Sequence, residues 1–190
     1  MSLLIPVSKP LKNIAIMSLI GGLSVVQTLR EITSCDFRVK WPNDIYIDNS
    51  KAGGIISELC VTQNNIAVIM GIGLNVNSSV DEIQIDEKFY DIQTISSVCG
   101  HKMDLIDLIA GIVCKLEPNI YLLENSFISE IVSQFHSIGW RMGERVKFRE
   151  YGRDWEEGII DRISDEGYLV IVDDTGRIVK ALVEGDVCPA

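Results

Sequence analysis

Three short segments of this 190-residue sequence hold residues whose types and spacing could do chemistry. The first covers residues 40–44 and reads KWPND, so an expected strand ends at a proline and is followed by an amide, Asn43, and a carboxylate, Asp44. Side chains in that place can be presented at the end of a sheet, where binding residues often lie. Pro-Asn-Asp is also ordinary turn chemistry, so this segment taken alone leaves both interpretations open.

The second segment, residues 51–56 (KAGGII), places Lys51 ahead of two glycines that enter an apolar strand. Glycines in that position, here Gly53 and Gly54, let a ligand or another backbone approach closely. A neighbouring lysine can reach a phosphate or a carboxylate as a compact positive charge. It can equally be a solvated lysine of a hairpin.

The third segment, residues 71–77 (GIGLNVN), follows a short apolar run and contains Gly71, Gly73 and Asn75. Glycines and asparagines in this arrangement can hold a nucleotide base or sugar. The segment lacks the third glycine of the dinucleotide-binding fingerprint and the Lys-Ser/Thr of a P-loop. An ordinary transition from strand to loop therefore remains the alternative.

A sheet with helices must position these segments, and the spacing of apolar residues predicts both. One helix is predicted over 12–32, with Gly21 and Gly22 packed closely against a sheet. A second is predicted to begin at an N-cap at Asp104 and to end or kink at Pro118, and a third is predicted over 126–136. Strands are predicted over 1–8, 37–41, 45–47, 54–59 and 66–72, with a turn at 48–50 and the last strand buried on both faces.

The residues after Gly139 have a different texture, with more charge and turn signals at short intervals. Strands are predicted over 145–149, 157–163, 168–172 and 178–183, with turns at 165–167 and 173–176. Short antiparallel strands in about 50 residues favour an SH3-like barrel. We therefore expect an α+β protein with two domains, a mixed sheet with helices over 1–140 and a small SH3-like β-barrel over 141–190.

Composition narrows the classes of function. A formal net charge of −10 disfavours a nucleic-acid-binding surface, because neutralising phosphates needs a basic patch. The five cysteines are scattered without CxxC spacing, which favours reduced thiols in a cytoplasmic protein over a structural zinc site. We expect no metal cluster and no membrane-spanning helix, and we expect the acidic stretch 81–87 to be a solvated loop.

Taken together and in this order, the three segments resemble those of the biotin protein ligase family, the biotin–[biotin carboxyl carrier protein] ligases. The matching stretches are KWPND at 40–44, KAGGIISEL at 51–59 and GIGLNVN at 71–77. Residues 143–187 resemble the SH3-like C-terminal domain of that family, so the resemblance covers essentially the whole chain. It implies a catalytic sheet like that of class II aminoacyl-tRNA synthetases in residues 1–140.

The resemblance implies a two-step acyl transfer that uses ATP, Mg²⁺ and biotin. Biotin attacks the α-phosphate of ATP to give biotinyl-5′-AMP and pyrophosphate. A lysine amine of the biotin carboxyl carrier domain of a biotin-dependent carboxylase then displaces AMP. By the same resemblance Lys51 and Asp44 are the catalytic residues. Lys51 would contact the biotin carboxyl group and the α-phosphate, and Asp44 would orient the incoming amine or hold a metal.

The remaining site residues are likewise implied by the resemblance. Trp41 would be an aromatic wall of the ligand pocket, Asn43 would lie near the reacting centre, and Asn75 near the adenine and phosphates. Close packing around the adenylate would be allowed by four glycines, Gly53, Gly54, Gly71 and Gly73.

The sequence departs from the family pattern at its start. Family members carry, ahead of the matched region, a biotin-contacting Ser/Thr segment, a Gln and a Gly-Arg-Gly-Arg-type loop, and Met1 matches the strand after that loop. We therefore expect an N-terminally incomplete catalytic domain, either cut from a longer ligase or a genuinely short relative. The alternative to an active ligase is a catalytically impaired relative that keeps carrier or nucleotide binding. A homodimer is a further expectation, whereas membrane and nucleic-acid partners, and with them a repressor role, are not expected.

Overall fold

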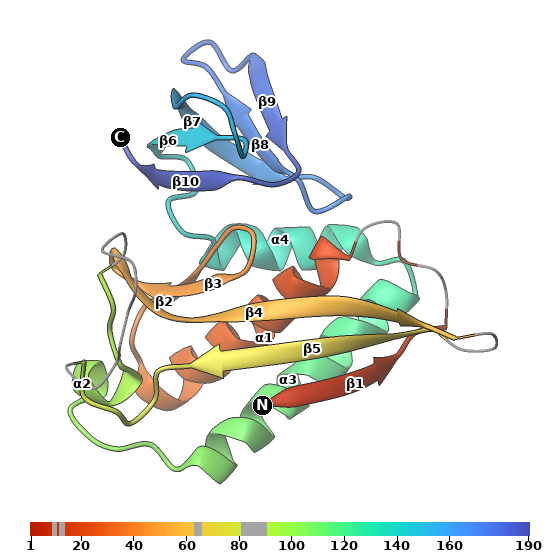
Figure 1. The fold of residues 1–190 in the computed structure, drawn as a ribbon, viewed down its shortest axis with the longest axis vertical. Helices are drawn as coiled ribbons and strands as arrows, with labels where there is room; N and C mark the ends of the chain where they lie inside the picture. The colour runs from red at the N-terminus through yellow and green to blue at the C-terminus, as the bar shows by residue number, and fades with distance from the viewer. Residues whose placement is uncertain (9–10, 12–13, 63–65, 81–90) are drawn as a thin grey trace.

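The structure is a computed structural model that describes residues 1–8, 11, 14–62, 66–80 and 91–190. It contains two five-stranded sheets, and helices cover one face of the first (Figure 1). This confirms the expected α+β class. The elements in chain order are β1 (Ser2–Pro6), α1 (Ala15–Thr33), β2 (Phe37–Lys40), β3 (Asp44–Ile47), β4 (Ser50–Val61), β5 (Ile66–Leu74), α2 (Ile95–Cys99), α3 (Leu105–Glu124), α4 (Ile128–Ile138), β6 (Arg145–Arg149), β7 (Glu156–Ile163), β8 (Leu169–Val172), β9 (Ile178–Leu182) and β10 (Asp186–Pro189).

The N-terminal sheet, formed by β1 to β5, has the strand order β1-β5-β4-β3-β2. Every one of its strand pairs is antiparallel, so the expected mixed sheet is corrected. The reason is connectivity, because β2 to β5 follow one another through short links that only an antiparallel arrangement allows. Parallel pairing in the described residues is confined to two isolated bridges, Val39 with Gly139 and Lys51 with Ile92.

Helix α1 is the centre of the N-terminal core and packs between the N-terminal sheet and α3 (Figure 1). A Cβ atom on Gly21 would lie 2.9 Å from the sulfur of Met70, and one on Gly22 would lie 2.9 Å from Cγ1 of Val39. The predicted close packing of these glycines against a sheet is confirmed. By length and composition α1 could cross a membrane, but 67% of its most apolar stretch is buried inside the protein, as in a core helix.

Helix α3 begins as predicted and ends later than predicted. The carboxylate of Asp104 accepts hydrogen bonds from the backbone N–H groups of Ile106 and Asp107, as an N-cap does. Pro118 lies inside the helix, which continues to Glu124, so the predicted end at the proline is wrong. Tertiary packing holds the helix past it, because the buried amide of Asn119 donates hydrogen bonds to side chains of α1.

Strand β5 is buried on one face only. Val68, Met70 and Ile72 face the helices, whereas Ile69 is 40% exposed on the opposite face. The prediction of a strand buried on both faces is therefore wrong, because helices cover only one side of this sheet among the described residues.

The C-terminal sheet, formed by β6 to β10, has the order β10-β6-β7-β8-β9 with antiparallel pairing throughout. Its predicted turns are present, and Gly167 and Gly176 adopt the positive φ angles of 85° and 79° that such turns require. Strand β10 was not predicted, nor was the short helix α2. All five cysteines are free thiols.

Candidate active cleft

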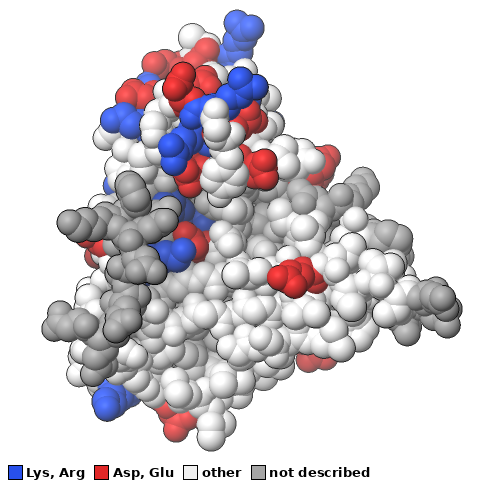
Figure 2. All heavy atoms as spheres, viewed as in Figure 1, with Lys and Arg blue, Asp and Glu red and all other residues white. Residues whose placement is uncertain are grey.

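The three chemistry-bearing segments meet in one open cleft on the exposed face of β4 and β5. Figure 2 shows this face of the molecule, which is formed largely by residues without charge. The cleft has a volume of about 710 Å³. All predicted site residues except Trp41 line it, together with apolar residues such as Ile56 and Ile92. The predicted residues that line it are Asn43, Asp44, Lys51, Gly53, Gly54, Gly71, Gly73 and Asn75.

The four glycines of the cleft fall into two pairs. A Cβ on Gly53 would lie 2.4 Å from the carbonyl oxygen of Gly73, and one on Gly54 would lie 3.0 Å from Oδ1 of Asp44. These two positions are therefore glycine because protein atoms already fill the space. On Gly71 and Gly73 the nearest atoms would be 3.8 and 4.0 Å away, so the space above them belongs to the cleft.

The charged centre of the cleft is the ion pair between Lys51 and Asp44. The ammonium nitrogen Nζ lies 2.6 Å from Oδ1, and the two side chains are 31% and 19% exposed. A β-bulge between Ile45 and Tyr46 shifts the register of β3 against β4, so that Asp44 lies opposite Gly54 while Tyr46 lies opposite Lys51. A bulge re-aims the side chains beside it. The pair is therefore produced by an irregularity that period-2 patterning does not reveal.

Asn43 fastens the turn before β3 to the middle of β4. Its backbone carbonyl oxygen accepts a 2.8 Å hydrogen bond from the N–H of Ile55. Its side-chain nitrogen donates a 2.7 Å hydrogen bond to the carbonyl oxygen of the same residue. Asn43 therefore has a structural role besides its place in the cleft lining, and the position of Asp44 depends on it.

The segment from Asp91 to Ile95 forms the wall beside Lys51. The backbone N–H of Lys51 donates to Asp91, and its carbonyl oxygen accepts from Gln93. Asn75 joins the same wall, because its side chain donates to the carbonyl oxygen of Gln93 and its own carbonyl accepts from Ile95. This wall, with Ile92 in the cleft lining, was missed by sequence reasoning. No local sequence pattern marks it, because it is defined by pairing with the distant residue Lys51. The acidic stretch 81–87, expected to be a solvated loop, lies before it and outside the described residues.

Trp41 lies away from the cleft, so the expected aromatic wall is corrected. Its side chain is 5% exposed, and the indole Nε1 donates a 3.0 Å hydrogen bond to the carbonyl oxygen of Gly167 in the C-terminal sheet. Side chains alternate along a strand. Because Val39 packs on Gly22 of α1, Trp41 two residues later follows the same face, away from the cleft.

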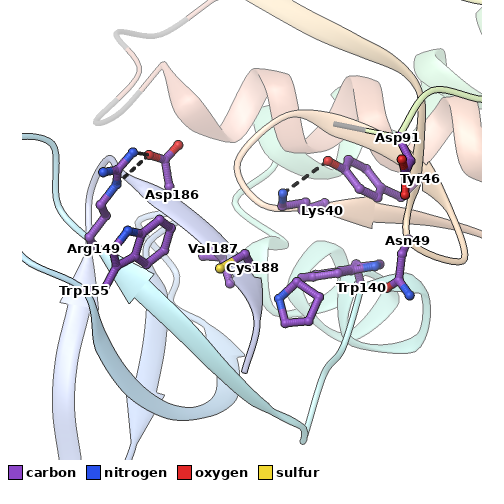
Figure 3. A pocket seen from close by; sticks show the side chains of 11 residues that line it. Lys40, Tyr46, Asn49, Asp91, Trp140, Arg149, Trp155, Asp186, Val187 and Cys188 are labelled. Carbon is purple, nitrogen blue, oxygen red and sulfur yellow. Dashed lines mark hydrogen bonds and ion pairs between the residues drawn. The ribbon is translucent and has the colours of Figure 1, made fainter. Parts of the chain in front are cut away.

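A second cavity of about 610 Å³ lies at the junction of the two sheets (Figure 3). Lys40, Tyr46 and Trp140 form one side, and Arg149 with its ion-pair partner Asp186 forms the other. The ammonium of Lys40 donates a 3.2 Å hydrogen bond to the hydroxyl of Tyr46 and lies 5.3 Å from the ring centre of Trp140. Burial lowers the pKa of Lys40, and the charge of Asp44 opposes that shift.

Metal-ligating clusters are absent from the part of the chain that the structure describes, where no group of three or more His, Cys, Asp or Glu side chains is placed to hold an ion. Asp44 is the carboxylate of the cleft lining, and Lys51 already binds it.

Comparisons with known proteins find similarity to biotin and lipoate protein ligases. The family described as "Biotin/lipoate A/B protein ligase family" matches residues 1–75. The "Bifunctional ligase/repressor BirA" of Bacillus subtilis is 27% identical over 191 residues, which cover 98% of this chain and 57% of that protein. The "Biotin–[acetyl-CoA-carboxylase] ligase" of Paracoccus denitrificans is 26% identical over 150 residues, 77% of this chain and 61% of that protein. The chain thus spans less than two thirds of the length of these relatives.

A solved structure agrees with the sequence comparisons. "Biotin protein ligase from Aquifex aeolicus in complex with biotin and ATP" has a TM-score of 0.77 with this chain at 26% identity. The similarity covers 98% of this chain and 75% of that one, and so extends over both sheets.

Proposed function

The chain belongs to the biotin protein ligase family, and from that premise we propose that it is an ATP-dependent biotin–protein ligase. In the first step the biotin carboxylate attacks the α-phosphorus of ATP, which gives biotinyl-5′-AMP and releases pyrophosphate. In the second step a lysine amine attacks the acyl carbon, an amide bond forms, and AMP leaves. The observation that carries the proposal is the Lys51–Asp44 ion pair in the cleft where the three segments meet, beside the open space over Gly71 and Gly73.

Lys51 supplies the positive charge of the first step. Negative charge builds on the oxygens of the α-phosphate as the biotin carboxylate approaches, and a fixed cation beside them lowers that barrier. The side chain of Lys51 is 31% exposed and belongs to the cleft lining, so its ammonium is within reach of a bound ligand. A lysine suits this position because its compact charge can contact a carboxylate oxygen and a phosphate oxygen together.

Gly71, Gly73 and the two asparagines of the cleft, Asn43 and Asn75, hold the nucleotide. The open space above Gly71 and Gly73 lets the adenylate lie directly against β5. The side chains of Asn43 and Asn75 border that space and offer amide groups to the phosphates and the base. The apolar lining from Ile56, on the same face of β4, suits the hydrocarbon part of the acid.

Asp44 acts in the second step by accepting a hydrogen bond from the incoming amine, which orients the nitrogen toward the acyl carbon. Its side chain is 19% exposed, beside the ammonium of Lys51. The donor set suits Mg²⁺ only as an ion that arrives on the triphosphate, with one carboxylate available to it. Bound there, Mg²⁺ would neutralise charge on the phosphates.

The acceptor we propose is the biotin carboxyl carrier domain of a biotin-dependent carboxylase. Its support is the name of the similar protein from Paracoccus denitrificans, a biotin–[acetyl-CoA-carboxylase] ligase. We further propose a domain boundary between Trp140 and Arg141, with a class II synthetase-like sheet before it and an SH3-like barrel after it. The two separate five-stranded sheets support this division. A homodimer and a cytoplasmic location remain parts of the proposal.

The test uses the 190-residue chain with ATP, Mg²⁺ and labelled biotin, and measures pyrophosphate release and labelling of a carrier domain. We expect Lys51→Ala to lower both by about 10²–10³-fold, as for loss of one charge-stabilising group. Lys115→Ala is the matched control, because Lys115 also forms a 2.6 Å ion pair, with Glu31, far from the cleft. Full activity of Lys51→Ala would refute the assignment. A wild-type chain that binds ATP or carrier without releasing pyrophosphate would establish the impaired relative instead.

A further inference from the structure

The contact between Trp41 and Gly167 joins the C-terminal sheet to the residues of the cleft. We infer that Trp41 is a positioning residue: through its hydrogen bond to Gly167 it holds the turn that carries Asn43 and Asp44, and so places the Asp44–Lys51 pair. The part of the inference that concerns ligation by the Asp44–Lys51 pair rests on the proposed function. The positional coupling is a property of the fold and can be measured separately.

The C-terminal end of this contact is a tight turn between β7 and β8. Gly167 has a φ of 85°, and a Cβ on it would lie 3.4 Å from Cδ1 of Leu19 and 3.7 Å from the backbone nitrogen of Ile16. The turn therefore lies against the start of α1 on one side and against Trp41 on the other. The positive φ angle favours a glycine there, and a Cβ would be in ordinary van der Waals contact with α1.

The N-terminal end of the contact is buried and has little freedom. Trp41 is 5% exposed, and it borders the same small space as Phe135 of α4 and Ile160 and Leu169 of the C-terminal sheet. A buried indole N–H needs a hydrogen-bond acceptor, and breaking this hydrogen bond would leave both the N–H of Trp41 and the carbonyl oxygen of Gly167 without this partner. The hydrogen bond therefore fixes the turn that follows Trp41 to the C-terminal sheet.

Three short steps lead from Trp41 to the reacting pair. Asn43, two residues after Trp41, makes two hydrogen bonds to Ile55, at 2.8 Å and 2.7 Å. Asp44 follows Asn43 directly and lies 2.6 Å from the ammonium of Lys51. A displacement of Trp41 is thus carried along a few residues of backbone to the carboxylate, because Asp44 is paired with Lys40, the residue directly before Trp41.

The experiment compares Trp41→Phe with Trp140→Phe in the full chain. Trp140 is a matched control, since its side chain is 6% exposed and its indole nitrogen also donates to a backbone carbonyl, that of Asp48, at 2.9 Å. The first readout is amide hydrogen exchange at Ile55, whose N–H donates to Asn43, relative to exchange at the core residue Val68. We expect Trp41→Phe to speed exchange at Ile55 about tenfold, and Trp140→Phe to change it less than about twofold.

A second pair of variants approaches the contact from the other sheet, in case Trp41→Phe fails to fold. Gly167→Ala and Gly176→Ala both place a Cβ at a positive φ angle, but around Gly176 nothing lies within 4 Å. Only Gly167→Ala should speed exchange at Ile55. If both members of either pair affect Ile55 equally, or neither does, the coupling is refuted.

The second readout is biotin-dependent exchange of pyrophosphate into ATP. Because Trp41 touches no ligand in the proposal, Trp41→Phe should lower kcat about tenfold and leave KM for ATP within about threefold. An unchanged kcat, or a loss confined to KM, would refute the positioning role. A chain that shows no pyrophosphate exchange while Ile55 still responds to Trp41→Phe would refute the proposed function and support the positional coupling.

Discussion

Two glycines on neighbouring strands, Gly53 of β4 and Gly73 of β5, should respond in opposite ways to the same substitution. In Gly53→Ala the new Cβ would lie 2.4 Å from the backbone oxygen of Gly73, and backbone cannot move aside without separating the strands. In Gly73→Ala the nearest atom to the new Cβ is 4.0 Å away, which is ordinary contact. We expect Gly53→Ala to lower the free energy of unfolding by about 1–3 kcal/mol or more, as overpacking does. Gly73→Ala should leave it unchanged or raise it by about 0.5 kcal/mol, since alanine restricts the unfolded chain.

Ligand binding should show the reverse order of sensitivity. The methyl group of Gly73→Ala enters the space proposed for the adenylate, and Gly73→Val enters it further. One misplaced methyl group in a binding site is worth about 1–3 kcal/mol, or about 10–200-fold in affinity. Calorimetric titration with ATP and biotin, beside urea unfolding of each variant, measures both quantities. If Gly73→Val bound nucleotide as tightly as the wild type, or if Gly73→Ala lost as much stability as Gly53→Ala, the assignment of this space to a ligand would fail.

Three further expectations concern stability and its dependence on pH. Burial lowers the pKa of Lys40 in the folded protein below its ordinary value of 10.5. Between the lowered pKa and 10.5 the unfolded chain therefore binds more protons than the folded protein. The free energy of unfolding should therefore rise with pH in that window relative to Lys40→Met, and urea unfolding from neutral pH to about pH 10.5 would show no such difference if the ammonium were solvated. Asp104→Ala removes two hydrogen bonds at the start of α3 and should cost about 1 kcal/mol, seen as a lower urea midpoint. Gly22→Ala places a Cβ 2.9 Å from Val39 and should cost about 1–3 kcal/mol by the same measurement, whereas an unchanged midpoint would show that α1 can shift on the sheet.

The candidate cleft illustrates how far local sequence carries. Lys51, Gly53 and Gly54 form one segment whose chemistry is visible in the order of residue types alone, and the structure places all three in the cleft lining with residues from the other two segments. The partnership of Lys51 with Asp44 was not visible, because it depends on the bulge in β3. The wall that contains Ile92 was invisible for another reason, since it is defined by long-range backbone pairing with Lys51.

What the sequence by itself determined are the features that depend on neighbouring residues. These include the cap at Asp104, the turn glycines of the C-terminal sheet, and the glycines that let α1 approach its sheet. Each depends on the type of one or two residues, either a short polar side chain that caps a helix or a glycine without a Cβ. Only the tertiary structure decided that α3 continues through Pro118 and that Trp41 faces Gly167 rather than the cleft. Both depend on what lies opposite in space, and burial against a distant element outweighs the local preference of a proline or the apparent place of an aromatic residue beside a motif.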